Sequence, residues 1–425
     1  MTHIQINNFI NRIKERMLIL KILKNKSITD VPFFKASGVH IGVRRNKNKK
    51  DLCVIYSEKP AVGAAVFTKN IIKAAPVLLD MLHIKSDNIR AIVANSGSAN
   101  ACTGEKGYKD ALEMAIVCAK HLNLKTEEVI VASTGVIGLA LPMDIIIPGI
   151  KECCDNLSYE GGPDASEAIM TTDTFSKKIT VEFELSGKIC TMSGIAKGSG
   201  MIHPNMGTML GFVVTDAAIS KSLLSKALSD SVEDSYNMVS VDGDTSTNDT
   251  VVVLANGACG NNFIDKEGSD FTSFMDALNF VNKELSKQIA KDGEGATKLV
   301  EVNLYGARTK KDAKILAKSI ITSSLVKAMM FGSDANLGRI FCALGYSTGE
   351  FEPMKVEISF KSEEEEITVA QDGFGLNFDE AKAKAILDRD KVNIIVKLHD
   401  GDYNATAWGC DLTYDYVKIN GSYRT

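Results

Sequence analysis

A threonine that follows a glycine in a turn-rich segment is the strongest chemical signal in this sequence. Thr208 follows Gly207, and the residues between Lys197 and this pair include two glycines and Pro204. Gly207 has no side chain to shield its carbonyl carbon, so the Thr208 hydroxyl can attack that carbon and move the acyl group from nitrogen to oxygen. Hydrolysis of the ester would expose Thr208 as a new N-terminus, and its amino group, with a pKa of about 7.7–8.0, could accept the hydroxyl proton during attack on a substrate. By itself, however, such a pair before an apolar run is more commonly a turn that enters a strand, here residues 209–214.

Other polar residues stand where turns are expected, and each also has an ordinary structural explanation. Thr134 and Gly135 follow the apolar residues 129–132, so a hydroxyl and a flexible N–H group lie at a strand end, as in an oxyanion hole, although most such pairs are only turns. Lys197 would usually be a surface charge, and Glu294, between two glycines, a solvated loop residue. Three further candidates, which would ordinarily be turn or terminal residues, are Thr171, Asn420 and Thr425.

Several long blocks of sequence, in one order along the chain, carry a more specific signal than any single motif. They are residues 64–70, 74–77, 95–104, 170–174, 197–210, 240–249, 292–298 and 416–420. Together they resemble the ornithine acetyltransferase family, the bifunctional glutamate N-acetyltransferases of arginine biosynthesis, from about residue 28 to the end. The sequence departs from that family at Ser98, where asparagine is common, at Leu337, often tryptophan, and at Gly207, usually alanine. Only Gly207 touches the chemistry, and its flexibility leaves the attack intact but puts the cleavage rate in doubt.

The resemblance implies a fold and a reaction. The fold is that of self-processing acyltransferases with an N-terminal threonine nucleophile, built of mixed α and β layers. Cleavage between Gly207 and Thr208 would give an alpha chain, residues 28–207, and a beta chain, residues 208–425, with two copies of each in the enzyme. Thr208 would take the acetyl group of N2-acetyl-L-ornithine and pass it to L-glutamate. Direct use of acetyl-CoA as a co-substrate stays open, and no cofactor is implied.

The resemblance also assigns roles to the candidate residues. It places the oxyanion in contact with Thr134 and the Gly135 amide. The Lys197 ammonium could pair with the α-carboxylate of an amino acid, and Glu294 would suit the cationic side chain of ornithine. The implied substrate pocket consists of Thr171, Lys197, Thr208, Glu294, Asn420 and Thr425.

Two alternatives use the same chain differently. One is a self-processing aminopeptidase or amidohydrolase of the same fold, which would release free acetate instead of acetylglutamate. The other is a catalytically silent binding protein, which would stay uncut and bind acetylornithine without turnover.

Composition agrees with a globular enzyme that acts on small molecules. The chain has 425 residues, 45% of them hydrophobic, enough for two or three domains, and a net charge of −4, which disfavours a nucleic-acid surface. Nine cysteines without a CxxC pair favour reduced thiols in the cytoplasm, and six scattered histidines without an HExxH spacing predict no metal site. Residues 1–27 read as a targeting segment, a docked helix or, as we favour, an upstream extension with Met17 as the true start; their apolar stretch is too short to span a membrane.

Three further segments resemble known sites or leave their role open. Residues 293–298 lack the spacing of a phosphate loop, so no nucleotide site is expected there. Residues 242–249 are rich in oxygen ligands but lack a calcium loop, so a hydrogen-bonded turn is expected. A last group supports either the active site or the packing of the two chains: Lys327, Asp334, Asn336 and Arg339.

Hydrophobic periodicity predicts the elements that must position these residues. Strands are expected at residues 51–56, 91–94 and 129–132, and helices at 108–124, 142–157, 221–237 and 271–290. A hairpin of residues 181–185 and 189–195 should lead into residues 197–210, which contain the predicted nucleophile Thr208. A second hairpin, of residues 355–360 and 366–370, should enclose the acidic residues 363–366 in its turn.

Overall fold

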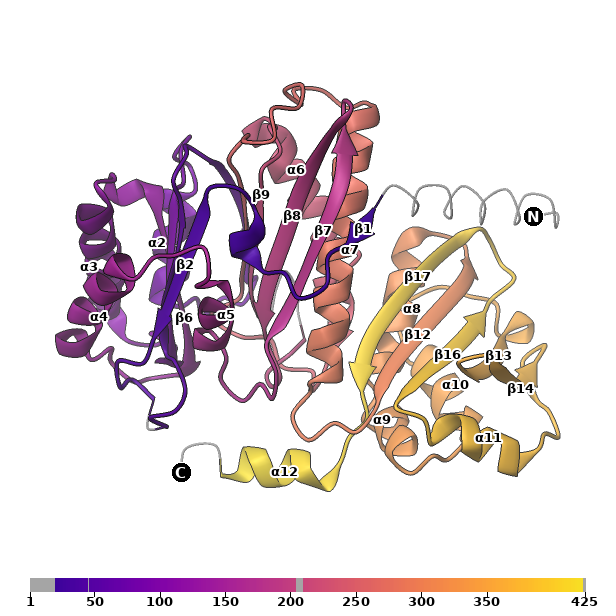
Figure 1. Cartoon of the computed structure of the whole chain (residues 1–425). Helices are drawn as coiled ribbons and strands as arrows, with labels where there is room; N and C mark the ends of the chain where they lie inside the picture. The colour runs from indigo at the N-terminus through magenta and orange to yellow at the C-terminus, as the bar shows by residue number, and fades with distance from the viewer. Residues whose placement is uncertain (1–19, 45, 204–208, 423–425) are drawn as a thin grey trace.

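The computed structural model of the protein describes residues 20–44, 46–203 and 209–422. The strands of these residues form three sheets, of four, six and seven strands, and helices cover the sheet faces (Figure 1). The mixed α and β layers predicted from the sequence are therefore confirmed.

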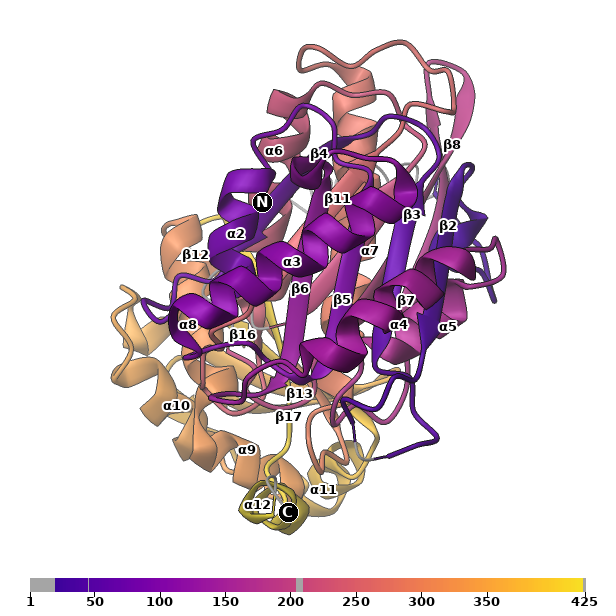
Figure 2. The same cartoon turned by 90° about the vertical axis from the view of Figure 1, so that its left-hand side faces the viewer.

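The four-stranded sheet is covered on its outer face by helices. Its strands, in the order β2-β3-β5-β6, are Phe34–Val39, Leu52–Ser57, Ala91–Ser98 and Val129–Val136. The covering helices, in front of the strands in Figure 2, are α2 (Ala75–His83), α3 (Gly104–Leu122) and α4 (Met143–Asp155), while the short helix α5 (Gly162–Ala168) contacts β2. Helix α3 buries Ala111, Ala115 and Cys118, which recur on one helical face, and it ends at Asn123 in the left-handed conformation.

The six-stranded sheet packs against the inner face of the four-stranded sheet. Its strands, in the order β1-β7-β8-β9-β11-β4, are Lys21–Ile22, Lys177–Leu185, Lys188–Lys197, Leu210–Thr215, Thr250–Ala255 and Val62–Phe67. β9 and β11 run parallel and are buried along their whole length, as expected for central strands covered on both faces. Ile92 and Ile130 of the first sheet share one core with Phe212 and Val252 of the second. Helices α6 (Lys221–Glu233) and α7 (Ser269–Lys291) cover the other face, which gives a helix–sheet–sheet–helix order of layers.

The seven-stranded sheet forms the other part of the molecule, in orange and yellow in Figure 1. Its strands, in the order β10-β17-β12-β16-β13-β14-β15, are Val239–Ser240, Tyr403–Cys410, Leu299–Ala307, Lys391–Lys397, Glu357–Ser362, Glu365–Gln371 and Phe374–Gly375. The helices of this part are α8 (Lys310–Thr322), α9 (Ser324–Phe331), α10 (Leu337–Gly345) and α11 (Glu380–Leu387). The last helix, α12 (Tyr414–Gly421), leaves this sheet and extends back below α7 (Figure 1).

Most of the predicted elements are confirmed, with two differences at their ends. β7 and β8 form the predicted hairpin, which turns at Ser186 and Gly187, both with positive φ. The helix predicted for residues 221–237 ends at Glu233, and a short 3-10 helix, Tyr236–Met238, follows it. The acidic residues lie only partly in the turn of the second hairpin, since β14 already begins at Glu365.

The segment before residue 28 contributes to the fold where the structure describes it. Lys21 and Ile22 form β1, which pairs with the edge strand β7, and the Lys21 ammonium lies 2.9 Å from the Glu182 carboxylate. The status of residues 1–27 as a dispensable extension and the proposed chain boundary at 207/208 stay predictions. None of the helices in the described ranges is both long and apolar enough to cross a bilayer.

Candidate active site

A cavity of about 270 Å³ lies where β6 and β8 end and β9 begins. Six of the residues predicted from the sequence line it, although they come from five separate parts of the chain: Thr134, Gly135, Thr171, Lys197, Glu294 and Asn420. Gly207, Thr208 and Thr425 lie outside the described residues. Met209 and Leu210, which directly follow Thr208 in sequence, also line the cavity. The structure therefore brings four of the six predicted pocket residues together with the predicted oxyanion pair, and the prediction for Thr208 and Thr425 stays untested.

The Thr134–Gly135 pair is held in place by tight backbone packing. Gly135 pairs with Gly97 of β5 at a φ of 130°, and a Cβ atom there would lie 2.4 Å from the Gly97 carbonyl carbon, so no larger residue fits. Asn248 donates a 2.8 Å hydrogen bond from its side-chain amide to the Ser133 carbonyl and so fixes the strand end from the other side. This rigid position suits an oxyanion hole, whose donors must be in place before charge develops.

Lys197 is a buried ammonium at the cavity wall. Its side chain is 8% exposed, and its Nζ donates a 3.3 Å hydrogen bond to Thr134 Oγ1. Burial lowers the pKa of Lys197 and Lys177 lowers it further, whereas the carboxylates of Asp173, Glu294 and Asp249 raise it. A surface position, the ordinary expectation for this lysine, is therefore wrong. An anionic group that enters the cavity would find a poorly hydrated positive charge there.

Glu294 supplies the opposite charge on the same cavity. It is 7% exposed, its backbone N–H bonds the Ser199 carbonyl at 3.1 Å, and its Oε2 accepts a 2.7 Å bond from the Asn420 side chain. A Cβ atom on Gly200 would lie 2.3 Å from that carboxylate oxygen, so the glycine in this loop allows the close approach. The cavity thus presents an ammonium and a carboxylate, a pair that complements an amino acid with a charged side chain.

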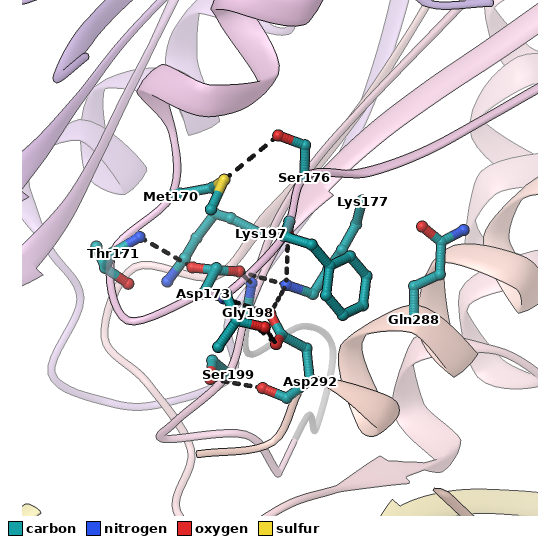
Figure 3. A network of polar contacts seen from close by, with 12 residues as sticks. Met170, Thr171, Asp173, Ser176, Lys177, Lys197, Gly198, Ser199, Gln288 and Asp292 are labelled. Atoms are coloured by element: carbon teal, nitrogen blue, oxygen red, sulfur yellow. Dashed lines mark hydrogen bonds and ion pairs between the residues drawn. The ribbon is translucent and has the colours of Figure 1, made fainter. Parts of the chain in front are cut away.

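Sequence reasoning missed a network of buried charges behind this wall (Figure 3). The Lys177 ammonium, fully buried, lies 2.6 Å from Asp173 Oδ1 and 2.5 Å from Asp292 Oδ2. Burial would raise the pKa of Asp173, but Lys197 and Lys177 outweigh it and hold the pKa of that carboxyl well below its usual range. Asp173 and Asp292 stand inside two of the sequence blocks, but nothing in the sequence indicates that Lys177, between these blocks, joins them.

The turn that carries Thr171 is fixed by the same network. The Thr171 N–H donates a 2.9 Å hydrogen bond to Asp173 Oδ2. The Arg44 guanidinium donates hydrogen bonds to the carbonyls of Met170 and Thr171, at 2.8 Å each. Arg44 has no obvious sequence signal, because its partners lie more than a hundred residues away.

Of the remaining segments singled out in the sequence, residues 242–249 also line the cavity, through Ser246, Asn248 and Asp249. Asp242 accepts hydrogen bonds from the backbone of Met201 and Ile202, at 2.6 and 2.8 Å. Within the segment the Asn248 N–H donates a 3.2 Å bond to Ser246 Oγ, so the predicted hydrogen-bonded turn is confirmed. The Lys327 ammonium donates to the Cys410 carbonyl in the seven-stranded sheet. Neither Lys327 nor the nearby Asp334, Asn336 and Arg339 is among the residues that line the cavity.

One group of metal-ligand types lies at the other end of β8 and β9. The ligand atoms of Cys190, Asp216 and Cys259 lie within 4.8 Å of one another. Burial raises the pKa of Asp216 to about 6, so a neutral carboxyl is favoured there in acidic solution. These residues are far apart in sequence, and their spacing could not have predicted the group.

Comparison with known proteins gives a consistent picture. A model of the ArgJ family matches residues 35–425. The arginine biosynthesis bifunctional protein ArgJ 1 of Clostridium acetobutylicum is 62% identical over 406 residues, which are 96% of this chain and 99% of the relative. The bifunctional protein ArgJ of Caldanaerobacter subterraneus is 55% identical over 392 residues, which are 92% of this chain and 97% of that relative.

Solved structures include a chain of the ornithine acetyltransferase of Mycobacterium tuberculosis, complexed with ornithine. It is 35% identical, covers 44% of this chain and 98% of its own, and has a TM-score of 0.41. The family model and the two relatives, each matched over almost its whole length, confirm the resemblance found in the sequence and show that this chain belongs to the ArgJ family of enzymes.

Proposed function

We propose that this enzyme transfers an acetyl group from N2-acetyl-L-ornithine to L-glutamate through an acetyl-Thr208 intermediate. The observation that carries the proposal is the convergence, on one cavity, of a buried ammonium, a buried carboxylate and the Thr134–Gly135 strand end. The family relatives are named for arginine biosynthesis. The choice of acetylornithine and glutamate as substrates comes from the family resemblance of the sequence.

The chemistry begins with self-cleavage. The Thr208 hydroxyl attacks the Gly207 carbonyl, the peptide shifts to an ester, and water hydrolyses that ester to leave a free Thr208 amino group. This amine then accepts the hydroxyl proton when Thr208 attacks the acetyl carbonyl of acetylornithine.

The acetyl transfer itself takes two balanced steps. In the first, the C–O bond to Thr208 forms, the oxyanion is stabilised by Thr134 and the Gly135 N–H, and the C–N bond to ornithine breaks as its amine takes the proton. In the second, the α-amine of glutamate attacks the acetyl-threonine ester and regenerates the hydroxyl. One amide replaces another, so the cycle needs no external energy source.

We assign the two charges of the cavity to the ends of the substrate. Lys197 pairs with the α-carboxylate, which both substrates have, and Glu294 pairs with the cationic side chain of ornithine. Thr171 and Asn420 complete the wall, and Asn420 also orients the Glu294 carboxylate.

The quaternary and cellular setting follows from the same proposal. Two alpha and two beta chains form the enzyme, and acetyl-CoA is a further candidate donor. All nine cysteines are free thiols, which fits a reducing compartment such as the cytoplasm.

The experiment that tests this function is an assay with acetylornithine and glutamate that measures acetylglutamate and free acetate side by side. The proposal predicts acetylglutamate as the main product and its loss in Thr208→Ala. Acetate as the main product would indicate the hydrolase alternative, and binding without either product would indicate a silent binding protein.

A further inference from the structure

The buried Lys177 lies close to the cavity but does not reach it. Its three ammonium protons have three acceptors: Asp173 Oδ1 at 2.6 Å, Asp292 Oδ2 at 2.5 Å and the Phe175 carbonyl at 3.4 Å. Such a saturated buried lysine cannot bind a substrate itself. Its effect on the site must pass through its partners.

Asp173 is the partner that matters for the cavity, because both of its oxygens are occupied. Oδ1 accepts from Lys177 and, at 2.7 Å, from the Gly198 N–H, while Oδ2 accepts from the Thr171 N–H at 2.9 Å. Figure 3 shows the three donors around this carboxylate. Three of its roughly four acceptor positions are therefore occupied, and one of the three donors is a full positive charge.

Lys197 is close enough to this carboxylate to lower its pKa, but the two side chains form no direct ion pair. Among the described residues Lys197 forms no ion pair with a carboxylate; its hydrogen bond goes to Thr134 Oγ1, at the cavity. A buried ammonium close to an aspartate that had no other cationic partner would be expected to form a direct ion pair, because leaving either charge unpaired in the interior is costly.

We propose that Lys177 is a positioning residue: it occupies Asp173, so that the Lys197 ammonium stays out of an internal ion pair and available to the carboxylate of a substrate. That this carboxylate belongs to an amino-acid substrate rests on the proposed function, whereas the arrangement of the charges does not. Lys177 also pairs with Asp292 and is thereby held between the segment of Asp173 and the segment of Asp292.

The first test is Lys177→Met, which removes the charge and keeps most of the volume. Lys197 should then move onto Asp173. The dissociation constant of L-ornithine, which has the same α-carboxylate but no acetyl group to transfer, should rise at least about tenfold when measured by calorimetry. In the acetyl-transfer assay, KM should rise more than kcat falls. An unchanged dissociation constant would overturn the proposal.

A direct readout is the titration of Lys197, followed by NMR in protein labelled with 13C at the lysine Cε and assigned with Lys197→Arg. Four charged groups act on this ammonium: Asp173, Lys177, Glu294 and Asp249. Lys177→Met removes the repulsion and gives Lys197 the Asp173 carboxylate, so the pKa of Lys197 should rise by about one unit. An unchanged or lower pKa would contradict the inference, whatever reaction the enzyme catalyses.

The double variant Lys177→Met, Asp173→Asn separates positioning from simple loss of structure. It removes the competing carboxylate as well, so Lys197 should be released and binding should recover toward that of the wild type. A merely structural role for Lys177 predicts a double variant at least as impaired as the single one. The double variant also restores the charge balance, so it serves as the test if Lys177→Met does not fold.

The matched control is Lys298→Met, which also replaces a buried, charged lysine by an apolar methionine. Lys298 is bonded to the Met330 and Leu387 carbonyls and to Ser333 Oγ, none of which lines the cavity. Its loss should leave the L-ornithine dissociation constant within about twofold of the wild type and the pKa of Lys197 within about 0.3 unit. If wild-type protein shows no acetyl transfer, the proposed function fails while the Lys197 titration still decides the positioning role.

Discussion

Two buried lysines in different parts of the molecule are satisfied in different ways. Lys177, behind the cavity, binds two carboxylates. Lys298, just before β12, instead donates to two carbonyls and a hydroxyl, at 2.6 to 2.8 Å. Burial lowers the pKa of Lys298, and the more distant Asp388 and Asp411 only partly oppose this.

The difference indicates what each region must do. The acceptors of Lys298 lie at the end of α9, in the turn after it and at the end of α11, so this lysine ties two helices to the seven-stranded sheet. The ion pairs of Lys177 join segments on either side of the predicted cleavage bond, since Asp173 precedes Thr208 and Asp292 follows it. Near the cavity the buried lysine is therefore stabilised by ion pairs, whereas in the other region the buried lysine is stabilised by hydrogen bonds to neutral acceptors. Substitutions on the two sides should separate catalysis from stability.

The largest effect is expected at the oxyanion site. Thr134→Val keeps the shape of the side chain and removes its hydroxyl, so kcat for acetyl transfer should fall by about a hundredfold or more, with KM changed much less. Steady-state kinetics on the cleaved enzyme measure both. A variant that keeps wild-type kcat would remove Thr134 from the mechanism.

In the other region, Lys298→Met should cost stability. It leaves three buried acceptors without their donor, which should lower the free energy of unfolding by about 2 kcal/mol. Urea unfolding of both proteins measures this loss. Equal stability would show that the neutral cage around Lys298 contributes little.

Glu294→Gln sharpens the comparison within the cavity. The variant removes the charge that should meet the ornithine side chain but keeps the bond to Asn420, so KM for acetylornithine should rise roughly tenfold. KM for glutamate, which has no cationic side chain, serves as the internal control and should change much less. Equal increases for both substrates would reassign Glu294 to a shared substrate group or to structure.

The smallest effect concerns His203, which precedes Thr208 in the block of residues 197–210. Burial, with a contribution from Lys318, lowers the pKa of His203 to about 4 from an ordinary value of 6.5. Between these values the unfolded chain binds more protons than the folded one, so stability should fall as the pH drops from about 6.5 toward 4. For this partly exposed ring the change should be on the order of 1 kcal/mol. His203→Gln should reduce the difference in urea midpoint between pH 7 and pH 4.5; an unaltered difference would assign the acid sensitivity to other groups.

Much of this arrangement could be predicted from local sequence. The strand that ends at Thr134–Gly135 and the hairpin that ends at Lys197 follow from apolar runs and a Ser-Gly turn. The convergence of six pocket residues was expected only through the family resemblance, because hydrophobic periodicity carries no information on which loops meet.

The charge network could not be predicted, for a physical reason. Lys177 and Asp292 are 115 residues apart, and their ion pair exists only because β7 packs beside the end of α7. Even the close spacing of Asp173 and Lys177 resembles an ordinary surface pair, and only their burial shows that it is part of the site.

The central claim, a self-cleaved enzyme that carries the acetyl group on Thr208, is tested most directly by intact-mass spectrometry of the purified protein before and after exposure to N2-acetyl-L-ornithine alone. The account predicts two fragments, the second beginning at Thr208, and the gain of one acetyl group on that second fragment, with neither change in Thr208→Ala. A full-length wild-type chain that still transfers acetyl groups, or an acetyl group on another residue, would contradict it.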